Sequence, residues 1–169
     1  MSDTADDSEL ALIIEQKLSE SSRINSATSK RYWYPLSLAT YGKEEVLAAI
    51  DSICSFATTM GEKTAAFEQR FAEYQGCEAA VMTNSGSSAN LVLAFHLTSR
   101  QTPALEPGSE VLMPVLTWPT QVWPIMISGL KVKLVDVSPE TLNIDPDDIE
   151  RSLSARTRAI FLMHAMGYS

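Results

Sequence analysis

Ala79-Ala-Val-Met-Thr83 leads directly into Asn84-Ser-Gly-Ser-Ser88, and a helical run from Ala89 to Leu97 follows. The first segment is a short apolar run, for which we predict a strand. The second is a turn rich in glycine and serine. A strand, a tight turn and a helix in this order begin a βα unit. The stretch therefore predicts an α/β protein.

The same alternation continues toward the C-terminus. We predict strands over 110–115, 131–137 and 158–163, a helix that ends near Ile127, and another helix that begins at Pro146 with Asp145 as its N-cap. Strands that alternate with helices at this spacing favour a mainly parallel sheet. In such sheets, ligands bind at the carboxyl ends of the strands. We therefore expect any site to be built from the segments that follow these strands.

The N-terminal part of the chain is predicted to be helical. Helices are expected over 8–20, 43–56 and 62–74, the last of which carries the apolar residues Ala66, Phe67 and Phe71. Residues 19–30 are serine-rich and polar, and we interpret them as a linker. The aromatic segment Tyr32-Trp-Tyr-Pro35 is expected to dock on a larger surface.

Length and composition bound the class of protein. The chain has 169 residues, 45% of them hydrophobic and 20% charged, which is ordinary for one globular domain. The net charge is −8, of which residues 1–20 supply −5. No block of Lys or Arg is present, which disfavours nucleic-acid binding. No apolar run approaches the ~18 residues of a membrane span, and the acidic N-terminus is unlike a secretory signal, so a cytoplasmic location is predicted.

A metal site is not predicted. Cys54 and Cys77 stand alone, and only His96 and His164 could join them, so neither a four-ligand zinc site nor an iron–sulfur cluster can be assembled. We interpret the cysteines as reduced residues that behave as small apolar side chains.

The turn Asn84-Ser-Gly-Ser-Ser88 has the chemistry of a phosphate-binding site. Backbone N–H groups at a helix N-terminus lack helical partners and carry partial positive charge. Gly86 allows close approach of the backbone, and Ser87 and Ser88 add hydroxyl donors. The turn is neither a P-loop nor a Gly-x-Gly-x-x-Gly dinucleotide motif. The serines also suit a plain helix cap, which composition alone favours.

Trp118 follows the strand over 110–115 and could stack on a flat heteroaromatic ligand. A single Trp is more often a packing residue, as we expect for Trp33 and Trp123. His164 and Asp136 also follow strands. One His without a partner is weak evidence for a site, and the turn-forming residues after Asp136 favour a structural role for it.

Together these motifs resemble the N-terminal portion of the DegT/StrS-type (DegT/DnrJ/EryC/StrS) sugar aminotransferases, from about Tyr32 to Gly167. The amino-acid sequences of the glycine–serine turn and of the segment around Trp118 most resemble those of the nucleotide-sugar 3-dehydrase branch. The motifs that carry the resemblance are Thr59-Met-Gly61, Thr83-Asn-Ser-Gly-Ser-Ser-Ala-Asn-Leu91, Pro107-Gly-Ser-Glu-Val111, Thr117-Trp-Pro-Thr120, Val135-Asp-Val-Ser-Pro-Glu-Thr-Leu-Asn-Ile-Asp145 and Thr157-Arg-Ala-Ile160 to His164.

The resemblance implies a fold. Residues 31–169 would form the N-terminal part of the large domain of a fold-type I PLP-dependent transferase, a three-layer α/β/α fold like that of aspartate aminotransferase, and the C-terminal part of that domain would be missing. Residues 1–30 would form a separate acidic helix and linker. In this fold the strand over 79–83 does not lie beside the strand over 110–115. The three later strands are expected to form a parallel patch.

The resemblance also implies a site. The cofactor would be pyridoxal 5′-phosphate (PLP) or pyridoxamine 5′-phosphate (PMP). Ser87 and Ser88 would bind its phosphate, Gly86 would shape the turn, and Trp118 would stack on the pyridine ring. Thr59, Met60 and Gly61 would line the entry of a nucleotide-linked keto sugar. The full-length protein would be a homodimer of nucleotide-sugar biosynthesis, of the deoxysugar, lipopolysaccharide or O-antigen type.

The expected reaction is that of a 4-keto-6-deoxyhexose 3-dehydrase, which removes the sugar 3-hydroxyl with the aminated cofactor. A PLP-dependent nucleotide-sugar aminotransferase is the alternative, and a truncated non-catalytic partner protein is a third reading. No catalytic residue is assigned, because the acid–base Lys or His is expected beyond Ser169. We therefore expect the chain alone to be inactive, whether it is an engineered piece, a truncated product or an incomplete gene.

Overall fold

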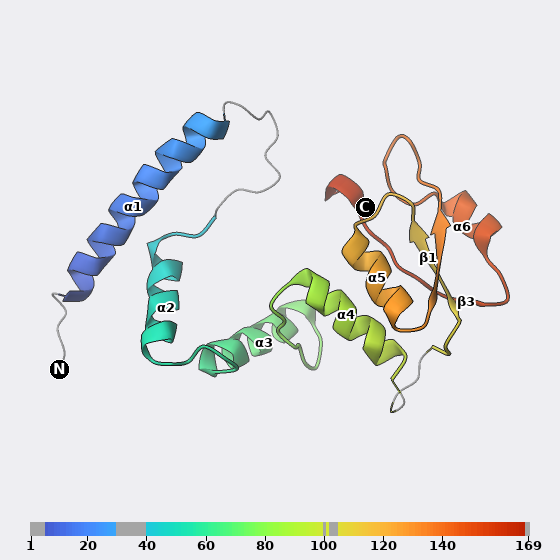
Figure 1. The fold of residues 1–169 in the computed structure, drawn as a ribbon, viewed down its shortest axis with the longest axis horizontal. Coiled ribbons are helices and arrows are strands. Elements are labelled where there is room, and N and C mark those ends of the chain that lie inside the picture. The colour runs from blue at the N-terminus through green and yellow to red at the C-terminus, as the bar shows by residue number, and fades with distance from the viewer. Residues whose placement is uncertain (1–5, 30–39, 100, 102–104, 168–169) are drawn as a thin grey trace. The chain divides into compact units, whose positions relative to one another are not determined.

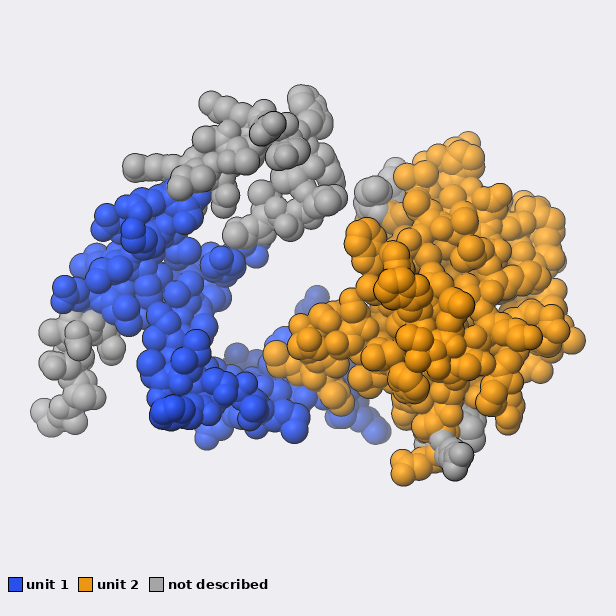
Figure 2. Space-filling model, viewed as in Figure 1, with its two compact units in different colours: residues 1–80 blue, residues 81–169 orange. Residues whose placement is uncertain are grey.

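The computed structural model describes residues 6–29, 40–99, 101 and 105–167 (Figure 1). The chain divides into two compact units, residues 1–80 and residues 81–169, which Figure 2 colours separately. Tyr32–Pro35, the aromatic segment predicted to dock on a larger surface, lies outside the described residues.

Unit 1 is helical and contains α1 (Asp6–Ser29), α2 (Lys43–Cys54) and α3 (Glu62–Gln75). α1 contacts α2, and Ile14 of α1 is buried. Lys43 at the start of α2 forms an ion pair of 3.2 Å with Glu15 of α1. α3 is followed by Gly76, whose φ of +68° is the left-handed conformation in which glycine commonly ends a helix. The predicted helices over 43–56 and 62–74 are thus confirmed within two residues.

The linker predicted over residues 19–30 is wrong as far as Ser29, because α1 continues to that residue. Serine lowers helix propensity by only about 0.5 kcal/mol relative to alanine. No Gly or Pro, which are the strong helix breakers, occurs between residues 8 and 29. The serine-rich segment therefore remains helical. The division into residues 1–30 and 31–169 stays a prediction.

Unit 2 contains a three-stranded parallel sheet in the order β2-β1-β3. This confirms the parallel patch predicted from the three later strands. Its elements in chain order are α4 (Gly86–Leu97), β1 (Glu110–Pro114), α5 (Pro119–Ile127), β2 (Lys131–Val135), α6 (Pro146–Ser152), β3 (Thr157–Ile160) and the short 3-10 helix η1 (Ala165–Gly167).

The core of unit 2 lies between the sheet and two helices. Val111 and Met113 of β1 pack with Ala94 of α4 and Ile125 of α5. α6 covers the other face, since Lys133, which points away from the core neighbour Val132, donates a 2.6 Å hydrogen bond to the carbonyl of Ser152. α5 connects β1 to β2 on one side, and α6 connects β2 to β3 on the other side of β1. Both connections can be right-handed only if α5 and α6 lie on opposite faces of the sheet. The unit is therefore part of a three-layer α/β/α domain.

The strand predicted over 79–83 is wrong, because these residues have no regular secondary structure. A strand exists only through hydrogen bonds to a neighbour, and both edges of β1 are occupied, by β2 on one side and β3 on the other. The expectation that 79–83 does not pair with 110–115 is consistent with this sheet order. The apolar run is thus present in the sequence, but in the described chain no strand pairs with it.

Candidate functional site

The glycine–serine turn forms the first turn of α4. Ser85 is the N-cap, and its Oγ accepts a 3.2 Å hydrogen bond from the N–H of Ser88 and lies 3.2 Å from the Ser88 Oγ. Ala89 donates to the carbonyl of Ser85. In the described chain, no partner is found for the N–H groups of Gly86 and Ser87. The predicted cap therefore exists, but it is made by Ser85, and it leaves two helix-start donors available.

The role of Gly86 in shaping the turn and allowing close approach stays a prediction. Its φ is not positive, so the turn does not require a glycine conformation. A Cβ added there would meet no atom within 4 Å. The space in front of the first turn of α4 is thus open. Because the Cα–Cβ bond of a helical residue tilts toward the helix N-terminus, a methyl group at Gly86 would extend into this open space.

Trp118 is the N-cap residue of α5, and its side chain is 68% exposed. Its backbone N–H donates to Oε1 of Gln121 at 3.2 Å, and the hydroxyl of Thr117 is also hydrogen-bonded to that oxygen. Trp123 in the middle of α5 is 61% exposed, so neither indole is a packing residue within unit 2. The two residues therefore cannot be distinguished by burial, but only Trp118 lies at a helix start.

The structure brings the first turns of α4 and α5 together. The two helices pack on the same face of the sheet. Nδ2 of Asn90, in α4, donates a 3.3 Å hydrogen bond to the carbonyl of Thr120, in α5. Gly86, Ser87 and Ser88 therefore begin one helix, and Trp118 begins the helix beside it.

Thr59, Met60 and Gly61 belong to unit 1, in the turn between α2 and α3. Met60 is 91% exposed. Lys63 stabilises this turn with three hydrogen bonds from its ammonium group to α2. The acceptors are the carbonyl of Ala48 at 2.7 Å, Oδ2 of Asp51 at 2.8 Å and Oγ of Ser52 at 2.9 Å. The role of Thr59–Gly61 in sugar entry stays a prediction.

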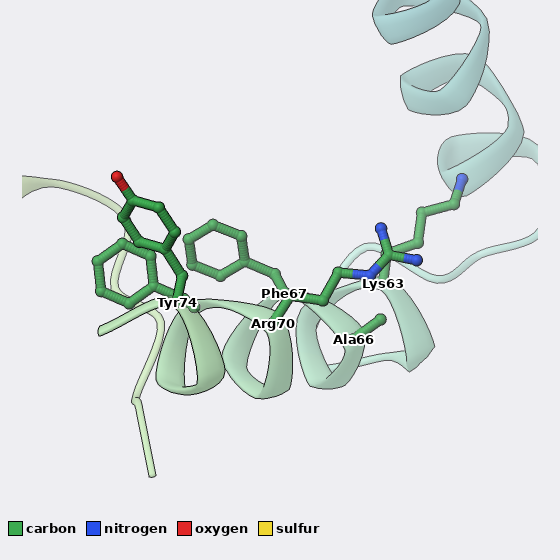
Figure 3. Close-up of a pocket in the computed structure, with 6 residues that line it drawn as sticks. Lys63, Ala66, Phe67, Arg70 and Tyr74 are labelled. Carbon is green, nitrogen blue, oxygen red and sulfur yellow. The ribbon is translucent and has the colours of Figure 1, made fainter. Parts of the chain in front are cut away.

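α3 carries an open pocket that the sequence did not single out as a site (Figure 3). The rings of Phe67 and Phe71 stack with their centroids 5.6 Å apart, and Tyr74 is 83% exposed. The cationic side chains of Lys63 and Arg70 line the same pocket. The sequence signal was present as the apolar stripe of this helix, which is typical of a packing face.

The segments after β2 and β3 lie at the carboxyl edge of the sheet. The backbone N–H of Asp136 donates to Oδ2 of Asp148 at 2.8 Å, and Oδ1 of Asp136 accepts from Val137. The Asp136 N–H and the guanidinium of Arg151 hold the pKa of Asp148 below its ordinary value. This supports a structural role for Asp136. His164 is exposed at the end of this edge.

The other residues considered from the sequence lie elsewhere. His96 is exposed in the last turn of α4. Cys54 and Cys77 are free thiols, but both are exposed, contrary to the small apolar role expected of them. Within the described ranges, no group of three or more His, Cys, Asp or Glu is placed to hold a metal ion. No helix in those ranges is both long and apolar enough to cross a membrane.

A model of one protein family matches most of the sequence. It covers residues 40–169 and describes the DegT/DnrJ/EryC1/StrS aminotransferase family. The chain belongs to this family.

Characterised relatives agree with this assignment. The chain is 37% identical over 134 residues to the GDP-4-keto-6-deoxy-D-mannose 3-dehydratase of Yersinia pseudotuberculosis, a match that covers 79% of the chain and 34% of that protein. The solved Escherichia coli enzyme of the same name, with bound hydrated PLP, superposes with a TM-score of 0.69 at 37% identity, covering 75% of this chain and 33% of that one.

A more distant structure comes from Streptococcus pneumoniae and is described as a sugar aminotransferase. Its PLP form superposes with a TM-score of 0.66 at 26% identity, covering 76% of this chain and 31% of that one, and a PMP form has also been solved. The chain thus has part of the PLP-dependent aminotransferase fold, as expected. It spans about a third of the length of the relatives it matches.

The donors at the start of α4 fit the phosphate group of the cofactor found in these DegT/StrS-family structures. A phosphate dianion needs several converging donors and no nearby carboxylate. Gly86 and Ser87 offer two N–H groups and one exposed hydroxyl, and no Asp or Glu lies in the first turn of α4. The exposed indole of Trp118 offers a flat surface for an aromatic ring.

Proposed function

We propose that this chain is the N-terminal part of a PLP- or PMP-dependent enzyme of nucleotide-sugar biosynthesis, and that the enzyme is a 4-keto-6-deoxyhexose 3-dehydrase. One observation carries the proposal. The first turn of α4 presents a set of phosphate donors, the adjacent start of α5 presents an exposed indole, and a hydrogen bond from Asn90 to Thr120 joins the two helices. The names of the relatives at 37% identity support the dehydrase over other reactions.

Each predicted residue has a role in this proposal. The N–H groups of Gly86 and Ser87 and the hydroxyls of Ser87 and Ser88 bind the cofactor phosphate, whose charge the α4 dipole stabilises. Trp118 stacks on the pyridine ring and keeps its plane fixed. Thr59, Met60 and Gly61 line the entry of the nucleotide-linked keto sugar. The bound cofactor supplies an electron sink for negative charge on the sugar carbon.

The rest of the proposal concerns the whole protein. In this proposal no residue of the chain is assigned as the acid–base group, which is a His in the dehydrase and a Lys in the alternative aminotransferase. The likeness to the Streptococcus pneumoniae protein supports that alternative. A homodimer and a cytoplasmic location complete the proposal.

Binding of PMP, titrated by calorimetry, tests the phosphate site. Ser87→Ala removes one hydroxyl donor to a charged group, worth about 1.5 kcal/mol, so the dissociation constant should rise about tenfold. Gly86→Ala should also weaken binding, because the new methyl group occupies the open space. Neither variant should lower the free energy of unfolding, since neither residue caps the helix with its side chain.

Ser85→Ala is the matched control. It removes the N-cap and should lower the free energy of unfolding by about 1 kcal/mol. Its effect on PMP affinity should be smaller than that of Ser87→Ala. Equal affinities in the unmodified chain and in a Ser87→Ala/Ser88→Ala double variant would reduce the motif to a helix cap and contradict the proposal.

A further inference from the structure

Pro124 lies inside α5 and is buried. Proline has no backbone N–H, so it cannot donate the hydrogen bond that a helix residue makes to the carbonyl four positions earlier. That carbonyl belongs to Thr120, in the first turn of α5. The helix therefore opens a backbone acceptor close to its N-terminus, on a side that faces other protein atoms.

Asn90 of α4 supplies a donor to this carbonyl. Its Nδ2 lies 3.3 Å from the Thr120 oxygen, and its side chain is half-buried. Backbone carbonyls removed from water need a hydrogen-bond partner, and losing one is costly. The acceptor that Pro124 leaves open in one helix is thus bonded to a side chain of the next helix.

The position of this bond relates it to the proposed site. Because a helix rises about 1.5 Å per residue, Asn90 lies about 6 Å along α4 from Gly86, and Thr120 lies within one turn of Trp118. The bond therefore joins the two helix starts within about one turn of the phosphate donors and of the indole. Along the described sequence no other side-chain hydrogen bond is seen between α4 and α5.

We propose that Asn90 is a positioning residue, which replaces the helix bond that Pro124 removes and so holds the phosphate-binding turn of α4 against the Trp118 end of α5. The positioning role rests on the proposed function, whereas the helix link does not. In this arrangement Asn90 and Pro124 act as a pair. Asn90 is needed because residue 124 cannot donate to Thr120.

A double-mutant cycle tests the pairing. Asn90→Leu removes the donor at similar size and without adding charge, and Pro124→Ala restores the N–H that can bond to Thr120. Amide hydrogen exchange of residues 120–123, read on the intact chain, is the measurement. Asn90→Leu should raise the exchange rate of residues 120–123 roughly threefold or more. In the Pro124→Ala background the same substitution should change this rate little.

Thr98→Val is the matched control, because the Thr98 hydroxyl bonds only to carbonyls of its own helix α4. It should leave exchange at residues 120–123 unchanged. An equal effect of Asn90→Leu with and without Pro124 would overturn the pairing, as would no effect at all.

Binding of PMP provides the readout that a purely structural role would not change. Asn90→Leu should raise its dissociation constant roughly threefold or more, and less in the Pro124→Ala background. If the unmodified chain does not bind PMP, the proposed function and the positioning role fail together, while the exchange cycle still decides the helix link. Coupling in exchange without any change in affinity would overturn the positioning role alone.

Discussion

Glu110 is the clearest case of a single residue that joins distant parts of the sequence. It begins β1 and is only 7% exposed. Oε2 accepts a 2.6 Å hydrogen bond from the Ser154 hydroxyl, and Oε1 accepts from the Arg156 guanidinium at 2.8 Å. Ser154 and Arg156 lie in the turn before β3, so the cluster fastens β1 to β3 at the amino end of the sheet. This end is opposite the proposed site.

The Glu110 cluster predicts a pH dependence of stability. The hydrogen bonds from Ser154 and Arg156 hold the pKa of Glu110 below its ordinary value of 4.5. A depressed folded-state pKa stabilises the protein above the unfolded-state pKa, and this stabilisation is lost as the pH falls through the folded-state value. Glu110→Gln should therefore lower the free energy of unfolding most near neutral pH. The difference in unfolding free energy between this variant and the unmodified chain should shrink below about pH 4.5.

Urea unfolding at neutral pH and at two acidic pH values would measure this difference. Glu106→Gln, which changes an exposed carboxylate of the preceding loop, is the control. A difference between Glu110→Gln and the unmodified chain that stays constant over the whole pH range would contradict the assignment of the cluster.

Leu142 has a φ of +59°, which a branched side chain tolerates poorly. The turn it forms lets Oδ1 of Asn143 accept a 2.7 Å hydrogen bond from the N–H of Ala165, which joins the segments after β2 and β3. Leu142→Gly should retain or raise the free energy of unfolding, whereas Leu142→Val should lower it by about 1 kcal/mol or more. Thermal unfolding of both variants checks this, and equal midpoints would show that the turn is unstrained.

At the scale of elements, α6 illustrates how local signals set a helix start. Oδ1 of Asp145 accepts a 2.9 Å hydrogen bond from the N–H of Asp147, and Pro146 occupies the first helical position. Asp147 and Asp148 lie in the first turn, where the helix dipole favours negative charge. The Asp145 cap and the helix start at Pro146 were predicted from the sequence.

Asp145→Ala should lower the free energy of unfolding by about 1 kcal/mol, because it removes the cap of α6. Glu150→Ala, on the exposed part of the same helix, should change it much less. Chemical denaturation of the two variants gives the comparison. A larger loss in Glu150→Ala would mean that the cap contributes little.

At the scale of the whole molecule, the chain exposes many large apolar side chains. Leu91, Val92, Leu93 and Phe95 of α4 are between 37% and 53% exposed. A helix that is apolar on all sides is normally covered on all sides. The exposed set therefore indicates that α4 has further contacts in the functional protein.

Self-association follows from this exposure. At increasing concentration, light scattering behind a sizing column should give a mass above the 18.5 kDa of one chain. The fluorescence of a dye that binds apolar surface should be high in the folded state. A monomer at all concentrations that unfolds in one cooperative transition would contradict this prediction.

Features that depend on local chemistry could be predicted from the sequence. Turn residues, caps and hydrophobic periodicity located α2, α3, α6 and the three strands, and the glycine–serine turn was recognised as a helix start with anion-binding chemistry. α1 was underestimated because serine weakens a helix without ending it. Site roles for Ser87, Ser88 and Trp118 came from the family resemblance, since composition alone favoured a cap and a packing residue.

Which segments pair depends on the packing of the folded chain and could not be predicted from local signals. Residues 79–83 have the composition of a strand but no neighbour to bond to, and strand formation requires a partner. The order β2-β1-β3 places segments far apart in the sequence side by side. The contact of Asn90 with Thr120 likewise depends on the packing of α4 against α5. Local sequence patterns predict which residues start a helix or form an extended strand. The pairing of strands and the packing of helices depend on which surfaces are buried together.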